Sequence, residues 1–186
     1  KELMENSIDA GAKKITVEIK NGGVSYMRVS DDGCGMAPED MPLALKRHAT
    51  SKIATAEDLA AIFTLGFRGE ALAAISSVSK VRILSKTAEA ANGAMLCADG
   101  GRIVSVGEAG CPAGTTITVE ELFSNVPARR KFLKKDATEA AAVAVSVEKI
   151  ALSHPEIAVR LITDGNIKLD TAGDGKPENA IYAVLG

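Results

Sequence analysis

Aromatic residues and long apolar runs are both scarce in this sequence of 186 residues. Only 3% of the residues are aromatic and tryptophan is absent, so Ala, Val, Ile and Leu must build the core. An aromatic platform that stacks single-stranded nucleic acid is therefore not expected. No run approaches the roughly 20 apolar residues of a membrane-spanning helix, and no charged-then-apolar signal segment opens the chain. We therefore expect no membrane association.

A strong net charge is missing too, and cysteine is rare. The formal net charge is −2 at pH 7, which lacks the basic footprint of a nucleic-acid-binding domain, so any contact with DNA is expected to be local. The three cysteines, Cys34, Cys97 and Cys111, are odd in number and lack the close spacing of a zinc or redox motif. This usage favours a reducing cytoplasm.

The remaining composition is typical of a folded protein. Hydrophobic residues make up 46% of the chain and charged residues 25%, well away from the compositions that favour disorder. This length suits one substantial core, and we expect a single domain over residues 1–186. The chain opens at Lys1 inside a helical pattern and without an initiator methionine, so we expect upstream residues to be missing.

Hydrophobic periodicity and turn residues predict the order of the elements. Apolar alternation on both sides of the turn-forming residues 21–23 predicts a β-hairpin over residues 15–29. Helices are predicted at 1–10 with a stop at Gly11, and at 38–46, 71–77, 136–152 and 177–185. Further strands are predicted at 78–85, 94–97, 102–106, 115–119, 158–163 and 167–170, and mostly loop at 47–68. Because helices and strands arrive in blocks without strict alternation, the pattern favours an α+β fold, a two-layer α/β sandwich with a mixed, mainly antiparallel sheet.

Three polar residues share one face of the first predicted helix. Glu2, Asn6 and Asp9 are spaced four and three residues apart, so their side chains project from the same side. A carboxylate there could activate water beside an amide oxygen that ligates magnesium, a cation that prefers oxygen donors. Taken alone, the same pattern is more typical of a solvated helix face.

A glycine-rich acidic turn, D-D-G-C-G-M from Asp31 to Met36, directly follows the second predicted strand. Its glycines let the backbone approach a ligand, and a carboxylate there can accept a hydrogen bond from an exocyclic amine such as that of adenine. Two other interpretations remain open from the residues alone. The turn could be purely structural, or it could be a calcium loop, although its spacing does not match an EF-hand.

A third segment, G-F-R-G-E-A-L from Gly66 to Leu72, is a glycine-bounded loop that enters a predicted helix. Free backbone N–H groups and the helix dipole at such a place favour phosphate. Neither G-x-x-x-x-G-K-[ST] nor a strand-linked G-x-G-x-x-G is present, so P-loop and Rossmann sites are not supported.

Five segments follow one another along the chain in a recognisable order: E-L-M-E-N-S-I-D-A-G-A, D-D-G-C-G-M, R-H-A-T-S-K, G-F-R-G-E-A-L-A-A-I-S-S-V and G-T-T-I-T-V-E-E-L-F-S-N-V-P-A-R-R-K-F-L. In this order they resemble the segments of the MutL family of DNA mismatch repair proteins. The match runs from Lys1 to Leu133, whereas residues 134–186 are poorly diagnostic. The helix motif, the glycine turn and the later G-T are shared with gyrase, the heat-shock chaperone and histidine kinases, and G-F-R-G-E-A-L with N-V-P-A-R-R-K-F-L distinguishes MutL. The resemblance implies the GHKL-type (Bergerat) ATPase fold, with ATP and Mg²⁺ as cofactors.

By this resemblance Glu2 is expected to be the general base that activates the attacking water. Asn6 is expected to be the magnesium ligand, with Asp9 nearby. Hydrolysis would then proceed by in-line attack of water on ATP, with the bound magnesium neutralising phosphate charge.

The nucleotide pocket follows from the same resemblance. Asp31 is expected to accept from the adenine amine, Gly33 and Gly35 to shape the pocket, and Thr115 to support it. The segments expected to fold over the phosphates and to become ordered with ATP comprise Thr50, Ser51, Lys52, Gly66, Phe67, Arg68, Gly69, Glu70, Ala71 and Leu72. Asp32 departs from the Asn that many relatives carry, and we expect only a minor effect because the adenine contact is assigned to Asp31.

Several other polar residues are expected to have no catalytic role. His48 lacks a second His or Cys nearby and is expected to hydrogen-bond within its loop, and His154 is expected on the surface. Cys34 has no base partner that could activate it. A basic run is expected to be a solvated face in preference to a DNA contact, and consists of Arg129, Arg130, Lys131, Lys134 and Lys135.

The resemblance implies a switching role in DNA repair. ATP closes a lid, two such domains from MutL-type chains dimerise, and the closed state couples a mismatch recognition protein to strand removal. DNA contact is expected mainly through regions absent here, and the location is cytoplasmic in a bacterium or nuclear in a eukaryote. Because the N-terminal arm and a lysine from the following domain are not visible in the sequence, two alternatives stay open: a nucleotide-binding module without turnover, and a non-enzymatic interaction fragment.

Overall fold

Eight strands form one sheet in the computed structural model of the protein, which describes residues 1–46 and 70–186. In space the described strands follow the order β5-β4-β3-β6-β2-β1-β7-β8, and every neighbouring pair is antiparallel except β1 with β7. Their bounds are β1 Lys14–Lys20, β2 Tyr26–Asp31, β3 Lys80–Lys86, β4 Gly93–Asp99, β5 Arg102–Ala109, β6 Gly114–Glu120, β7 Ala158–Thr163 and β8 Asn166–Asp170.

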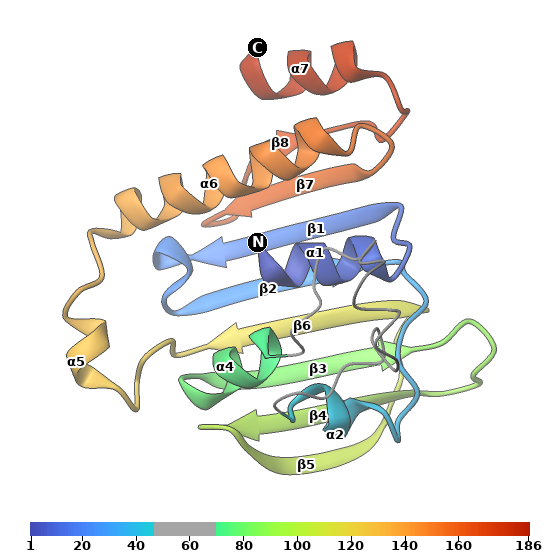
Figure 1. The fold of residues 1–186 in the computed structure, drawn as a ribbon, viewed down its shortest axis with the longest axis vertical. Coiled ribbons are helices and arrows are strands. Elements are labelled where there is room, and N and C mark those ends of the chain that lie inside the picture. The colour runs from blue at the N-terminus through green and yellow to red at the C-terminus, as the bar shows by residue number, and fades with distance from the viewer. Residues whose placement is uncertain (47–69) are drawn as a thin grey trace, which may run out of the picture.

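The helices include α1, α4 and α6, which pack on one face of this sheet and lie in front of the strands in Figure 1. Their bounds are α1 Glu2–Asp9, α2 Met41–Ala44, α4 Ala71–Ser77, α5 Pro127–Arg130, α6 Asp136–Ser153 and α7 Pro177–Leu185, with a short 3₁₀ turn η1 at Asn21–Gly23. The predicted α+β two-layer sandwich with a mixed, mainly antiparallel sheet is confirmed. None of the helices in these two ranges is long and apolar enough to cross a membrane.

The predicted hairpin is confirmed as β1 and β2. Ile15, Val17 and Ile19 are all buried and alternate with less buried residues, because successive side chains of a strand point to opposite faces. The second strand begins at Tyr26, two residues later than predicted. Val24 is helical there (φ −78°, ψ −44°), which delays the extended backbone.

Four of the predicted helices are confirmed, but the helix predicted at 38–46 is wrong. Only the single turn α2 forms. Pro42 has no N–H to donate to the carbonyl of Pro38, so a continuous helix through both residues would lose that hydrogen bond. The single turn α5 was not predicted, and β3 begins at Lys80 because Val78 still caps α4.

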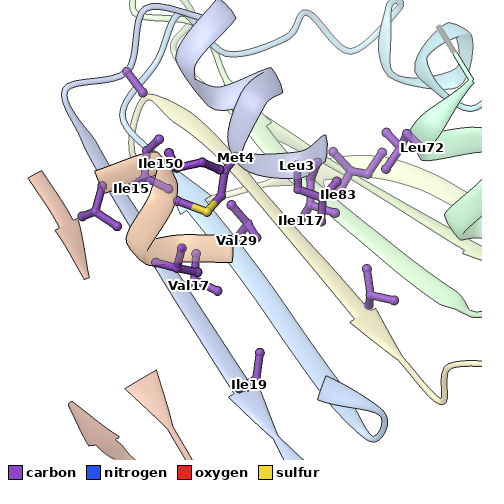
Figure 2. Packing of buried hydrophobic residues seen from close by; sticks show 14 of the residues in the cluster. Leu3, Met4, Ile15, Val17, Ile19, Val29, Leu72, Ile83, Ile117 and Ile150 are labelled. Atoms are coloured by element: carbon purple, nitrogen blue, oxygen red, sulfur yellow. The ribbon is translucent and has the colours of Figure 1, made fainter. Parts of the chain in front are cut away.

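The core fills the space between the helices and the sheet. From α1, Leu3 and Met4 point down onto the strands, where Val17, Val29 and Ile117 face them (Figure 2). These five side chains are less than 10% exposed. Burying this face of α1 fixes the helix on the sheet, and the opposite, polar face of α1 is thereby held in a defined orientation.

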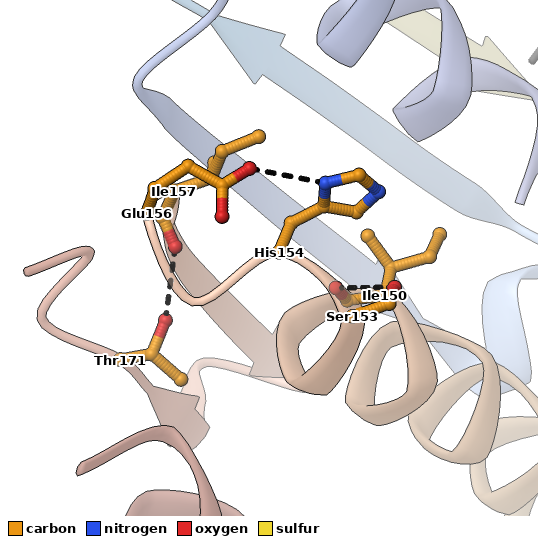
Figure 3. A network of polar contacts seen from close by, with 6 residues as sticks. All are labelled: Ile150, Ser153, His154, Glu156, Ile157 and Thr171. Atoms are coloured by element: carbon orange, nitrogen blue, oxygen red, sulfur yellow. Dashed lines mark hydrogen bonds and ion pairs between the residues drawn. The ribbon is translucent and has the colours of Figure 1, made fainter. Parts of the chain in front are cut away.

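The connection from α6 to β7 is held by local polar contacts (Figure 3). His154 Nδ1 lies 3.1 Å from Glu156 Oε1, and the Ser153 hydroxyl donates to the carbonyl of Ile150 at 3.0 Å. The Thr171 hydroxyl also receives the N–H of Val159 at 2.9 Å. His154 is thus partly exposed and paired with a neighbouring carboxylate, as expected of a surface residue.

Candidate nucleotide site

One carboxylate joins three segments of the chain at the end of β2. Asp31 Oδ2 accepts a hydrogen bond from the Ser7 hydroxyl of α1 at 2.6 Å. Its Oδ1 accepts from the backbone N–H of Gly33 at 3.0 Å and of Thr115 in β6 at 3.3 Å. Hydrogen bonds to a charged acceptor are among the stronger ones in proteins, so the carboxylate is held in one orientation.

The two glycines of the turn sit where no side chain fits. A Cβ on Gly33 would come within 2.8 Å of the Ala10 side chain and 3.1 Å of Asp31 Oδ1. Gly35 has a φ of +72°, and a Cβ there would collide with the backbone carbonyl of Lys86. Both positions require glycine, because the turn passes too close to the ends of α1 and β3 to leave room for a Cβ.

Two buried serines belong to this arrangement, and sequence reasoning missed both. Ser7 is 3% exposed and Ser85 is 1% exposed. The Ser85 hydroxyl accepts the N–H of Met36 at 2.8 Å and lies 2.9 Å from the hydroxyl of Thr115. It also donates to the carbonyl of Gly114 at 2.9 Å. Serine is too common for its position to signal such a role, and only the fold brings Ser7 and Ser85 to the turn.

The polar face of α1 belongs to the same helix that holds this carboxylate through Ser7, but Ser7 itself lies on the buried side of the helix. Glu2, Asn6 and Asp9 all lie within α1, so their spacing places them on one side of the helix. The Glu2 side chain is 53% exposed, whereas Asn6 and Asp9 are half-buried. The Asn6 amide makes no side-chain hydrogen bond within the described part of the chain. No group of three or more His, Cys, Asp or Glu in residues 1–46 and 70–186 is arranged to hold a metal ion.

A protein-family model described as "Histidine kinase-, DNA gyrase B-, and HSP90-like ATPase" matches residues 1–126, which is more than half of the chain. The chain belongs to this ATPase family. The helix face, the glycine turn and the supporting strand β6 all lie inside the matched range.

Within this ATPase family, the individual relatives that the chain resembles are MutL proteins. The chain is 55% identical over 185 residues to the DNA mismatch repair protein MutL of Dictyoglomus turgidum, and 52% identical over 186 residues to that of Symbiobacterium thermophilum. It spans only 32% and 29% of the length of these two relatives. A solved structure described as the Aquifex aeolicus MutL ATPase domain complexed with ADP is 33% identical with a TM-score of 0.80, and the match covers 99% of this chain and 65% of that one. The predicted resemblance to MutL proteins is confirmed, and it extends beyond Leu133 to the whole chain.

In this member of the ATPase family, Asp32 has a structural contact of its own. Its Oδ1 accepts the backbone N–H groups of Lys13 at 2.7 Å and Lys14 at 2.8 Å. These two residues form the entry to β1, so Asp32 ties the glycine turn to the connection between α1 and β1. An Asn at this position could present the same side-chain oxygen to these two N–H groups.

Part of the predicted phosphate-binding set lies outside the described residues. This applies to Thr50, Ser51, Lys52, Gly66, Phe67, Arg68 and Gly69, and to His48. Of the remaining three, Glu70 directly precedes α4, Ala71 begins it, and the side chain of Leu72 is buried in the core at 8% exposure. Only the backbone of Leu72 is therefore available to a nucleotide.

The basic run lies on the surface around α5. Its five cationic side chains are exposed and form no ion pair with another described residue. Phe132 within the run is 87% exposed. This environment agrees with the predicted solvated face. The run comprises Arg129, Arg130, Lys131, Lys134 and Lys135.

The Asp32 contacts predict different costs for two substitutions. Asp32→Ala leaves two backbone N–H groups without their acceptor, and we expect it to lower the free energy of unfolding by about 1 kcal/mol at this exposed position. Asp32→Asn retains the acceptor oxygen and should change that free energy by less than about 0.5 kcal/mol. Urea denaturation at constant m-value measures both. Equal losses in the two variants would show that the side-chain oxygen does not hold the turn.

Proposed function

We propose that residues 1–186 form the ATP-binding domain of a MutL-type DNA mismatch repair ATPase. The observation that carries this proposal is the Asp31 carboxylate, fixed by Ser7, Gly33 and Thr115. Membership of the ATPase family and the similarity to MutL proteins support the same conclusion.

The fixed carboxylate suits adenine because an ionised aspartate can only accept hydrogen bonds. The adenine 6-amino group is a donor, and it would meet an acceptor that needs no reorientation on binding. Ser7 occupies one site on Oδ2, and a carboxylate oxygen can accept more than one hydrogen bond. Gly33 and Gly35 keep side chains away from the turn, so that a flat base can approach the backbone closely.

The polar face of α1 supplies the groups for hydrolysis. Glu2 is exposed and could take a proton from an attacking water, which defines a general base. The amide oxygen of Asn6 has no described partner and is a hard donor of the kind that Mg²⁺ accepts alongside phosphates and waters. Bound magnesium would supply neutralisation of phosphate charge. Asp9 lies one turn further along the same helix face.

The phosphates would be covered by the predicted segments around Thr50–Lys52 and Gly66–Leu72. Closure of these segments over ATP, followed by pairing with a second MutL-type chain, would make nucleotide binding a switch. In the whole protein this switch would couple a mismatch recognition protein to strand removal, with DNA held mainly by regions beyond these residues. A location in the bacterial cytoplasm fits the bacterial relatives. The single-domain boundary at 1–186, with an arm before it and another domain after it, is part of the same proposal.

Asp31→Asn tests the adenine contact. The amide can present an N–H where the carboxylate presents an acceptor, so we expect ATP binding to weaken by roughly 1–3 kcal/mol. Isothermal titration calorimetry measures the affinity, and Asp99→Asn, an exposed residue at the end of β4, is the matched control. Equal ATP affinities for Asp31→Asn and the unmutated protein would refute the assignment.

Glu2→Ala and Asn6→Ala separate the two proposed roles on α1. In the full-length natural protein, Glu2→Ala should abolish turnover and leave ATP affinity unchanged, because a general base acts only in the transition state. Asn6→Ala should weaken magnesium-dependent ATP binding as well as turnover, because it removes a metal ligand. Phosphate release and nucleotide titration give the two readouts. Binding without any turnover in the unmutated protein would instead identify a nucleotide-binding module without hydrolysis.

A further inference from the structure

One acidic residue of α1 has a partner that the proposed chemistry does not use. Glu5 is 8% exposed, unlike the open Glu2 on the same helix. Both of its carboxylate oxygens contact the Lys1 ammonium, Oε1 at 2.8 Å and Oε2 at 3.0 Å. A buried carboxylate is costly without a charged or hydrogen-bonded partner, so Glu5 holds Lys1 firmly.

The same ammonium lies close to Glu2 without being hydrogen-bonded to it. Lys1 Nζ is 3.7 Å from Glu2 Oε1, which is within the range of an ion pair but beyond an ordinary hydrogen bond. The pKa of Lys1 is raised, mainly by its hydrogen bond to Glu5, so the ammonium remains charged. Lys1 therefore has two acidic neighbours and is bonded to one of them.

We infer that Glu5 is a positioning residue that holds the Lys1 ammonium away from Glu2, so that the oxygens of Glu2 remain free to accept a proton from water. This inference rests on the proposed role of Glu2 as the general base. A lysine bonded directly to Glu2 would occupy the lone pairs that the water needs, and it would favour the ionised carboxylate over the protonated one that must form as the proton is transferred.

The geometry explains why Glu5 decides where Lys1 lies. The Lys1 ammonium lies at the end of a long, flexible side chain, so its position depends on its charged partners. The Glu5 side chain is 11% exposed and has little freedom. Without the negative charge on Glu5, the flexible ammonium would have Glu2 as its nearest carboxylate among the described residues, less than 1 Å beyond a direct hydrogen bond.

The test compares ATP hydrolysis by three variants of the full-length natural protein. Glu5→Gln preserves the shape of the side chain but releases Lys1, and we expect kcat for ATP hydrolysis to fall roughly tenfold, a fraction of what a general base contributes, with KM unchanged. Adding Lys1→Met to Glu5→Gln removes the ammonium, and most of the lost kcat should return. Glu2→Ala gives the background rate of ATP hydrolysis in the absence of the proposed general base.

A remote ion pair provides the matched control. Arg160 Nη2 lies 2.8 Å from Asp170 Oδ2 on the β7–β8 hairpin, and Asp170→Asn should leave kcat unchanged. The inference is overturned if Glu5→Gln keeps full kcat, if Lys1→Met fails to restore activity to Glu5→Gln, or if Glu5→Gln weakens ATP binding as much as turnover. If the unmutated protein binds ATP but does not hydrolyse it, the proposed hydrolytic function fails, and this inference fails with it.

Discussion

The hydrogen bonds to the Asp31 carboxylate are the interaction on which the rest of the site depends. They join α1 through Ser7, the glycine turn through Gly33 and strand β6 through Thr115. The three segments come from distant parts of the sequence, and each already packs on the sheet. Because the carboxylate is fixed before any ligand arrives, recognition of an amine there would need no rearrangement of the protein.

The burial of α1 gives the second constraint. Leu3 and Met4 pack into the core (Figure 2), so the opposite face of the helix presents its polar residues away from the core, while the buried Ser7 contacts Asp31. This places proposed recognition and proposed chemistry on neighbouring surfaces of one helix. The two glutamates at the start of the helix differ in environment, since Glu2 is open to water and Glu5 is buried against Lys1. Two carboxylates of the same type can thereby take different roles.

Much of the fold was predictable because local patterns and long-range packing agree. The alternation in β1 and the long helix α6 follow from local sequence patterns. The helix at 38–46 was wrong because Pro42 removes a hydrogen bond, and the parallel pairing of β1 with β7 depends on contacts that no local pattern encodes. Asp31 and the α1 face were proposed from spacing and resemblance, and their roles remain predictions. The fold was needed to find the contacts of Ser7, Ser85 and Asp32. Hydroxyl and carboxylate groups can hydrogen-bond many partners, and only the folded chain determines which partners lie within reach.

The central claim is that a fixed acceptor at Asp31 selects adenine. Guanine carries a carbonyl oxygen where adenine carries its amine, so GTP would place one acceptor against another. Calorimetric titration of the same protein with ATP and with GTP, both with magnesium, tests this most directly. The account predicts that ATP binds at least about tenfold more tightly, a difference of roughly 1.4 kcal/mol. Equal affinities for the two nucleotides would contradict it.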